Sequence, residues 1–103
     1  MARILIFLQT SGHYLLKHKN STIRYLGICA LVQLESAKDY AKEIAALLND
    51  SGQDVVTIAL EALEELDVKV DIDDSIVQKL INSDVALIQE KASKLFTKWG
   101  LVK

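Results

Sequence analysis

An internal repeat of about 32 residues constrains this chain more than any other feature. A pattern of apolar and small residues between positions 15 and 34 returns 32 positions later, between 47 and 66. It returns in a weaker form after another 33 positions and ends at Trp99. A period of this size, with two helices and a polar turn in each unit, is typical of α-solenoids. We therefore predict a single all-α domain over residues 1–103: a short right-handed α-solenoid of about three helix-turn-helix (HEAT-like) units, approximately residues 1–34, 35–66 and 67–103.

The composition agrees with helices joined by short turns. The chain of 103 residues contains no proline and only four glycines, which are the residues that turns and strand ends usually use. Half of the residues are hydrophobic and a quarter are charged, enough for one modest core.

Apolar spacing and capping residues predict the individual helices of the first half. Residues 3–17 are expected to form the first helix. Ser21 or Thr22 is expected to cap a helix that ends near Leu34, and a third helix is expected over residues 36–48. The apolar stripe of the second helix is predicted to contain Ile23, Leu26, Gly27, Ala30, Leu31 and Leu34.

In the second half, Asp54 is expected to cap a helix that ends at Leu66. Residues 67–74 alternate between polar and apolar, and we interpret them as an extended connector whose Val68, Val70 and Ile72 fill the groove between units. Asp73 or Asp74 should cap a short helix over 75–81, and a last helix should run from 85 to 99 and stop at Gly100.

A different fold stays open at this point. Short apolar runs from Ile4 to Leu8 and from Val55 to Leu60 could be parallel strands of a small α/β ligand-binding domain, because periodicity alone does not separate short strands from buried helices. The turns at Gly12 and Gly52 would then be candidate site loops.

Residues 21–31 and 50–63 resemble HEAT or armadillo-type repeats, and the first segment is also similar to helices in the trunks of vesicle-coat adaptors. The family pattern often has a proline in the first helix of each unit and an arginine early in the second. Here the prolines are missing, Arg24 is present, and Val56 and Gln89 stand at the equivalent places. The resemblance implies a protein-binding scaffold without chemistry of its own.

The polar residues do not form a recognisable catalytic or metal site. His13, His18 and Cys29 lack the close-spaced pairs of zinc ligands, and the aspartates of residues 67–74 lack the glycine and glutamate of a calcium loop. Phosphate-binding glycine loops and hydrolase motifs are absent from the sequence. We therefore expect no enzyme activity, no cofactor and no metal.

Charge is segregated along the chain. The net charge is +4 in residues 1–42, −9 in residues 43–74 and +3 in residues 75–103, which gives −2 in total. A nucleic-acid-binding helical repeat is the alternative partner class, since Lys91, Lys94 and Lys98 share a helix face. The acidic middle opposes a continuous phosphate track, so nucleic acid is the less favoured partner.

Outward positions of the three second helices should form the binding surface for another protein. The repeat offsets predict three rows across these helices: Tyr25, Thr57 and Glu90; Cys29, Glu61 and Lys94; Gln33, Glu65 and Lys98.

The two ends of the chain are rich in apolar residues, including Phe96, Trp99, Leu101 and Val102, and suggest a homodimer. No apolar run reaches the length of a membrane span, and one cysteine agrees with a reducing compartment, so we expect a cytoplasmic protein.

Overall fold

The computed structural model describes residues 14–35, 37–66 and 69–101, and within these ranges it contains helices and no strand. Residues 14–16 are helical. The elements that follow are α2 (Ser21–Gln33), η1 (Ala37–Tyr40), α3 (Ala41–Ala46), η2 (Leu47–Asn49), α4 (Gln53–Leu66), α5 (Asp74–Ile81) and α6 (Ala86–Lys98), where η marks a 3-10 helix. The all-α prediction is confirmed for this part of the chain.

The strand alternative is wrong where it can be examined. Residues 55–60 belong to α4, because their apolar side chains continue at helical spacing into the buried Ala62 and Leu63. The other proposed strand, from Ile4 to Leu8, lies outside the described residues.

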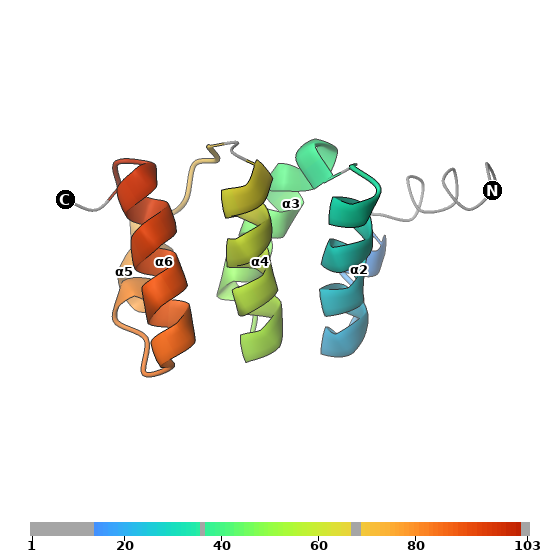
Figure 1. Ribbon diagram of the computed structural model, residues 1–103. Coiled ribbons are helices and arrows are strands. Elements are labelled where there is room, and N and C mark those ends of the chain that lie inside the picture. The colour runs from blue at the N-terminus through green and yellow to red at the C-terminus, as the bar shows by residue number, and fades with distance from the viewer. Residues whose placement is uncertain (1–13, 36, 67–68, 102–103) are drawn as a thin grey trace.

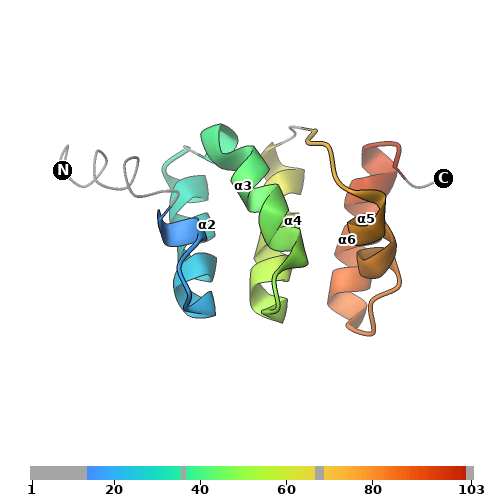
Figure 2. The ribbon, with the colours of Figure 1, turned by 180° about the vertical axis from the view of Figure 1, so that it is seen from behind.

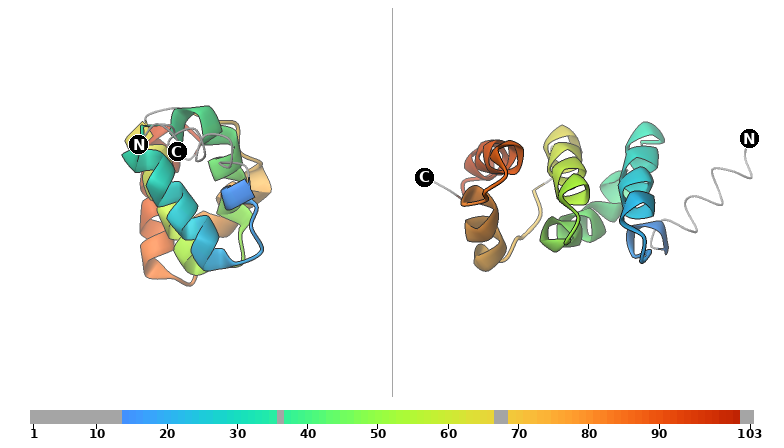
Figure 3. Two further views of the ribbon diagram at one scale, coloured as in Figure 1. Left: turned by 90° about the vertical axis from the view of Figure 1, so that its right-hand side faces the viewer. Right: turned by 90° about the horizontal axis from the view of Figure 1, so that it is seen from below.

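The helices form two layers (Figures 1 and 2). Helices α2, α4 and α6 stand side by side in one layer, with α4 packed against both neighbours. Helices α3 and α5 lie behind them, and the end-on view shows both layers (Figure 3). The molecule is elongated along the row, with principal extents of 44 × 25 × 19 Å.

Burial follows the sequence repeat. Gly27, Ala59 and Ala92 occupy equivalent positions on α2, α4 and α6, and all three are buried. The next equivalent set is Leu31, Leu63 and Phe96, each fully buried. The periodic apolar pattern therefore marks the side of each front helix that faces the core.

The second turn of α2 packs very closely on the preceding segment. A Cβ atom added at Gly27 would lie only 3.0 Å from the Leu15 Cβ atom. Glycine at this position therefore allows the backbone of α2 to approach the helical residues 14–16.

Several helix ends differ from the prediction. Asn20, rather than Ser21 or Thr22, caps α2, since its side-chain oxygen accepts a hydrogen bond from the Thr22 N–H at 2.8 Å. Asn20 directly precedes α2, and its backbone carbonyl accepts the first hydrogen bonds of the helix. Helix α4 begins at Gln53, so Asp54 lies in its first turn and is not the cap.

The two later ends are as predicted. Asp73 caps α5 by accepting the Ser75 N–H at 3.1 Å. Gly100 ends α6 with a φ of +77°, and the Leu101 N–H then bonds the Phe96 carbonyl at 2.8 Å. This is the left-handed glycine termination common at helix C-termini.

The predicted continuous helix over 36–48 is wrong. The structure divides it into η1, α3 and η2. A 3-10 turn has three residues per turn, so it directs both Ala37 and Tyr40 toward the core, where each is buried. An α-helical turn would separate these two positions by about 60° more.

The apolar C-terminal end is not an exposed surface. Phe96 is fully buried and Trp99 is 7% exposed, so both belong to the core rather than to a free end. These two residues are therefore not available at the surface for the predicted homodimer contact. Val102 and the apolar residues of the first predicted helix before residue 14 lie outside the described residues, whereas Leu16 of that helix is buried.

An ion pair joins the first front helix to the turn before the second. Arg24 Nε lies 2.7 Å from Asp50 Oδ2, and a second guanidinium nitrogen, Nη2, lies 3.0 Å from Asp50 Oδ1. The Arg24 Nη1 donates to the His18 carbonyl, and Asp50 Oδ1 accepts the Gly52 N–H at 2.8 Å. The two side chains are only 14% and 7% exposed. This bidentate pair therefore fixes three backbone segments relative to one another.

Removing either partner should destabilise the fold through an uncompensated buried charge. We expect Arg24→Met and Asp50→Asn each to lower the free energy of unfolding by about 2 kcal/mol, and the double variant to lose about 1–2 kcal/mol less than the sum. Urea unfolding followed by the fluorescence of Trp99, the single tryptophan, measures this. Lys94→Met, which removes a largely exposed ion pair, should cost under about 0.5 kcal/mol and serves as control. Strict additivity would show that the pair carries no coupling.

A side chain at Gly27 should separate α2 from residues 14–16. We expect Gly27→Val to lower the free energy of unfolding by about 2 kcal/mol, because the added atoms overpack the contact with Leu15. Valine has a higher helix propensity than glycine, so propensity alone would not destabilise this variant. Gln33→Val, at an exposed position of the same helix, is the control for a valine that meets no close contact. An equal effect of both substitutions would contradict a steric role for Gly27.

Candidate protein-binding surface

The nine predicted binding residues all lie on the front helices, and none is buried. Gln33, Glu61, Glu65, Glu90, Lys94 and Lys98 are exposed, whereas Tyr25, Cys29 and Thr57 are half-buried. The helices therefore present to solvent, fully or in part, each of the positions that the repeat offsets selected.

Each ion pair between α4 and α6 joins one residue of the predicted rows to a residue outside them. Lys91 Nζ lies 2.8 Å from Glu61 Oε1, and Lys94 Nζ lies 3.1 Å from Glu64 Oε1. Positions separated by the full repeat point the same way from their own helices, so they do not meet. Contact requires side chains on facing flanks, which lie about one turn apart along the helix. Lys94 thus pairs with Glu64 and not with Glu61, the residue of α4 in its own row.

The hydrogen bond to Glu61 raises the pKa of Lys91 above its ordinary value. Burial opposes this shift, and the negative charges of Glu61, Glu64 and Glu90 add to it. Lys91 is therefore held in its charged form beside α4.

A groove of about 880 Å³ runs between α2 and α4 and reaches the first turn of α6. It brings together Tyr25, Thr57 and Glu61 from the predicted surface. It adds three apolar residues, one from each front helix: Leu26, Ile58 and Leu87. Its remaining lining is polar or lies at the base of α4: Ser21, Thr22, Ser51, Gly52, Gln53, Asp54 and Val55.

Sequence analysis did not predict the two exposed leucines of this groove: it assigned Leu26 to the core and did not select Leu87. Leu26 was predicted to lie in the buried stripe of α2 but is 56% exposed, and Leu87 is 50% exposed. The core side of α2 is occupied by Gly27, Ile28 and Leu31, so Leu26 falls outside it. Together with Tyr14 they are the large hydrophobic side chains most exposed in the described ranges. Two such leucines on one groove are typical of an interaction site.

The charged residues that line the groove are acidic. The acids Asp54 and Glu61 line it, and the described lining residues include no lysine or arginine. The pKa of the Tyr25 hydroxyl is raised, first by the charge of the Cys29 thiolate, then by partial burial and a hydrogen bond with Cys29, and further by Glu61 and Asp54. Each of these neighbours disfavours the phenolate.

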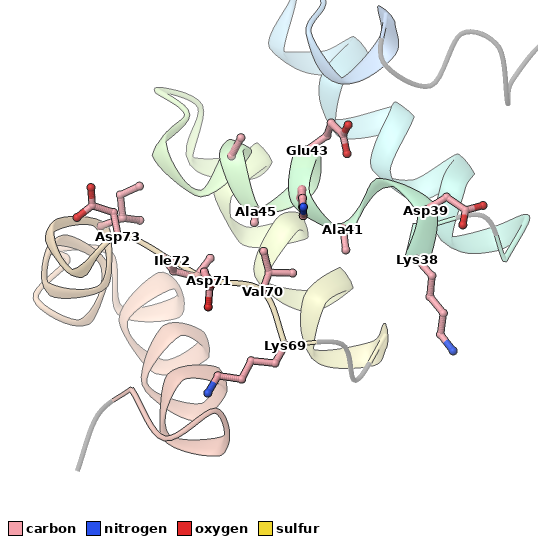
Figure 4. A pocket seen from close by; sticks show the side chains of 13 residues that line it. Lys38, Asp39, Ala41, Glu43, Ala45, Lys69, Val70, Asp71, Ile72 and Asp73 are labelled. Carbon is pink, nitrogen blue, oxygen red and sulfur yellow. The ribbon is translucent and has the colours of Figure 1, made fainter.

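A second hollow, of about 940 Å³, lies on the other layer between α3 and residues 69–73 (Figure 4). Val70 and Ile72 are half-buried and pack against the core, as the connector interpretation predicted, whereas Val68 lies outside the described residues. Sequence reasoning did not identify this hollow as a site. Its charges are mixed in sign, with three lysines and four acids, and no strongly exposed large hydrophobic residue lines it. The front groove is therefore the better candidate for recognition.

The described ranges hold no group of three histidine, cysteine, aspartate or glutamate side chains placed to bind a metal ion. None of the helices described is both long enough and apolar enough to cross a membrane.

Comparison with known proteins assigns no family. No family model matches the chain, and no curated protein or solved structure matches it either. Any function must therefore be argued from the surface itself.

The hydrogen bond between Tyr25 and Cys29 gives a direct test of the groove geometry. We expect Cys29→Ala to lower the pKa of Tyr25 toward its ordinary value of about 10, because the thiolate charge and the hydrogen bond both disappear. Carbon-13 NMR of labelled tyrosine, assigned with Tyr25→Phe, measures the titration. Gln33→Ala, one turn further along α2, should leave it unchanged, and an unchanged pKa in Cys29→Ala would place the two side chains apart.

Proposed function

We propose that this chain is a non-catalytic helical-repeat scaffold that binds another protein through the outward face of α2, α4 and α6. The observation that carries the proposal is that the exposed Leu26 and Leu87 line, together with Tyr25, one groove of about 880 Å³. A soluble domain rarely leaves such side chains together on one concave surface without a partner.

A short right-handed solenoid of three HEAT-like units is the architecture that we propose. Two observations support it: burial repeats along α2, α4 and α6, and the Arg24–Asp50 pair links one unit to the turn of the next. An arginine early in the second helix is also the feature of the HEAT pattern that this chain retains.

The alternative of a nucleic-acid-binding repeat has less support. Lys91 and Lys94, two of the lysines that favoured it, pair with Glu61 and Glu64. Acidic residues of α4 thus partly neutralise these lysines, which leaves less positive charge for a phosphate backbone. We keep the expectation of a cytoplasmic protein, which comes from the single cysteine, Cys29, as part of the proposal.

Selection from a displayed library of random peptides tests the proposal without assuming the partner. Peptides of about 16 residues, enough for four helical turns, should be enriched on the wild-type chain. The enriched peptides should lose at least about tenfold in affinity for the Leu26→Glu/Leu87→Glu variant, because charge removes the apolar contacts.

Tyr14→Glu is the matched control, since Tyr14 is 65% exposed but lies outside the groove. Circular dichroism shows that each variant keeps its helical fold. Enriched peptides that bind the double variant as well as the wild type, or a selection that enriches nothing, would contradict a binding role for this face.

A further inference from the structure

We infer that the front groove accepts a cationic amphipathic helix supplied by the partner protein. This inference rests on the proposed function and adds the chemistry of the bound segment. It follows from the spacing of the apolar side chains, from the charge of the lining and from the aromatic residue that lines the same groove.

The apolar contacts lie on three consecutive helices. Leu26 is on the second turn of α2, Ile58 is on the second turn of α4, and Leu87 is on the first turn of α6. All three line the same groove, and the front helices stand side by side (Figure 1). Packed helices are separated by about 8–10 Å.

This separation matches the repeat of an amphipathic helix. Residues seven apart on one face of an α-helix are separated by about 10.5 Å along its axis. A helix laid across the row can therefore set one apolar side chain near each of Leu26, Ile58 and Leu87. Helix-in-groove recognition uses this kind of spaced apolar contact.

The charge of the lining selects the polar face of that helix. Asp54 and Glu61 line the groove, and no described lining residue is basic. Lys91, outside the lining, already pairs with Glu61 at 2.8 Å, so Asp54 is the main acid available to a bound cation. The first turn of α4 contributes a partial positive charge, but Asp54 lies in that turn and opposes it. Lysine or arginine on the flanks of the bound helix would complement these acids, whereas glutamate would be repelled.

Tyr25 adds a further preference for a cation. Its half-buried ring lies in the groove with its hydroxyl close to Cys29. A guanidinium or ammonium group that reaches Glu61 would pass near this ring, and aromatic faces attract cations.

Two designed peptides of about 18 residues, roughly five helical turns, test the inference. Both carry leucine at heptad spacing, and they differ only in having lysine or glutamate at the polar positions. Fluorescence anisotropy with the full chain should give at least about tenfold tighter binding of the lysine peptide, and its affinity should fall as salt is raised.

Variants of the chain then locate the binding. Asp54→Asn/Glu61→Gln should weaken the lysine peptide at least about fivefold, and Leu26→Ser/Leu87→Ser should do the same. Glu64→Gln is the matched control: it also removes the carboxylate partner of a lysine on α6, but Glu64 lies outside the groove. It should leave the affinity within about twofold.

The outcomes separate this inference from the proposed function. Equal binding of the two peptides, binding of neither, or no effect of Asp54→Asn/Glu61→Gln would overturn the cationic helix. If the library selection still enriches peptides that depend on Leu26 and Leu87, the scaffold role stands and the partner has different chemistry. If the lysine peptide binds Leu26→Ser/Leu87→Ser with the same affinity as the wild type, the contact lies elsewhere and the inference is overturned.

Discussion

The ion pair between Arg24 and Asp50 is the interaction on which the first half of the structure depends. It holds α2, the carbonyl of His18 and the turn before α4 in one hydrogen-bonded group. The same contact sets the base of the front groove, because Ser21 and Gly52 line it and a Cβ at Gly52 would lie 3.3 Å from the Ser21 Cβ. The largely buried charge pair therefore holds together the two segments that form the base of the candidate site. Side chains held in this way keep a groove preformed, which lowers the entropic cost of binding.

The junction between α4 and α6 is built from different interactions. Val56 is the residue of α4 at the position that Arg24 has in α2, and it is 4% exposed. Ser83, whose hydroxyl accepts the Val85 N–H at 3.1 Å, takes the turn position that Asp50 holds. Lys79 also reaches Asn49 at 3.1 Å, and the exposed pairs Glu61–Lys91 and Glu64–Lys94 lie on the outside. Exposed ion pairs contribute little to stability, so apolar packing holds this junction together.

The apolar repeat predicted most of the fold, because the same burial requirement acts on each front helix. It identified α2, α4, α5 and α6 to within a few residues and placed the nine surface residues on solvent-facing positions. It did not predict the division of residues 37–49, where burial of both Ala37 and Tyr40 favours a 3-10 turn. It also assigned Leu26 to the core, because an apolar residue at the edge of a stripe looks the same in sequence whether it is buried or exposed. The groove depends on that distinction, so its apolar part could not be read from the sequence.

The segregated charge of the sequence has two separate roles in the structure. Part of the acidity of the middle segment is used internally: Asp50 neutralises Arg24, and Glu61 and Glu64 neutralise lysines of α6. The basic flanks thus meet the acidic middle within one molecule. Glu61 also lines the groove, but there it pairs with Lys91. Asp54 lines the same groove as Tyr25, Leu26 and Leu87 and belongs to none of these three ion pairs. Acids that balance a neighbouring lysine stabilise the row of helices, whereas an acid in an apolar groove is available to select what binds there.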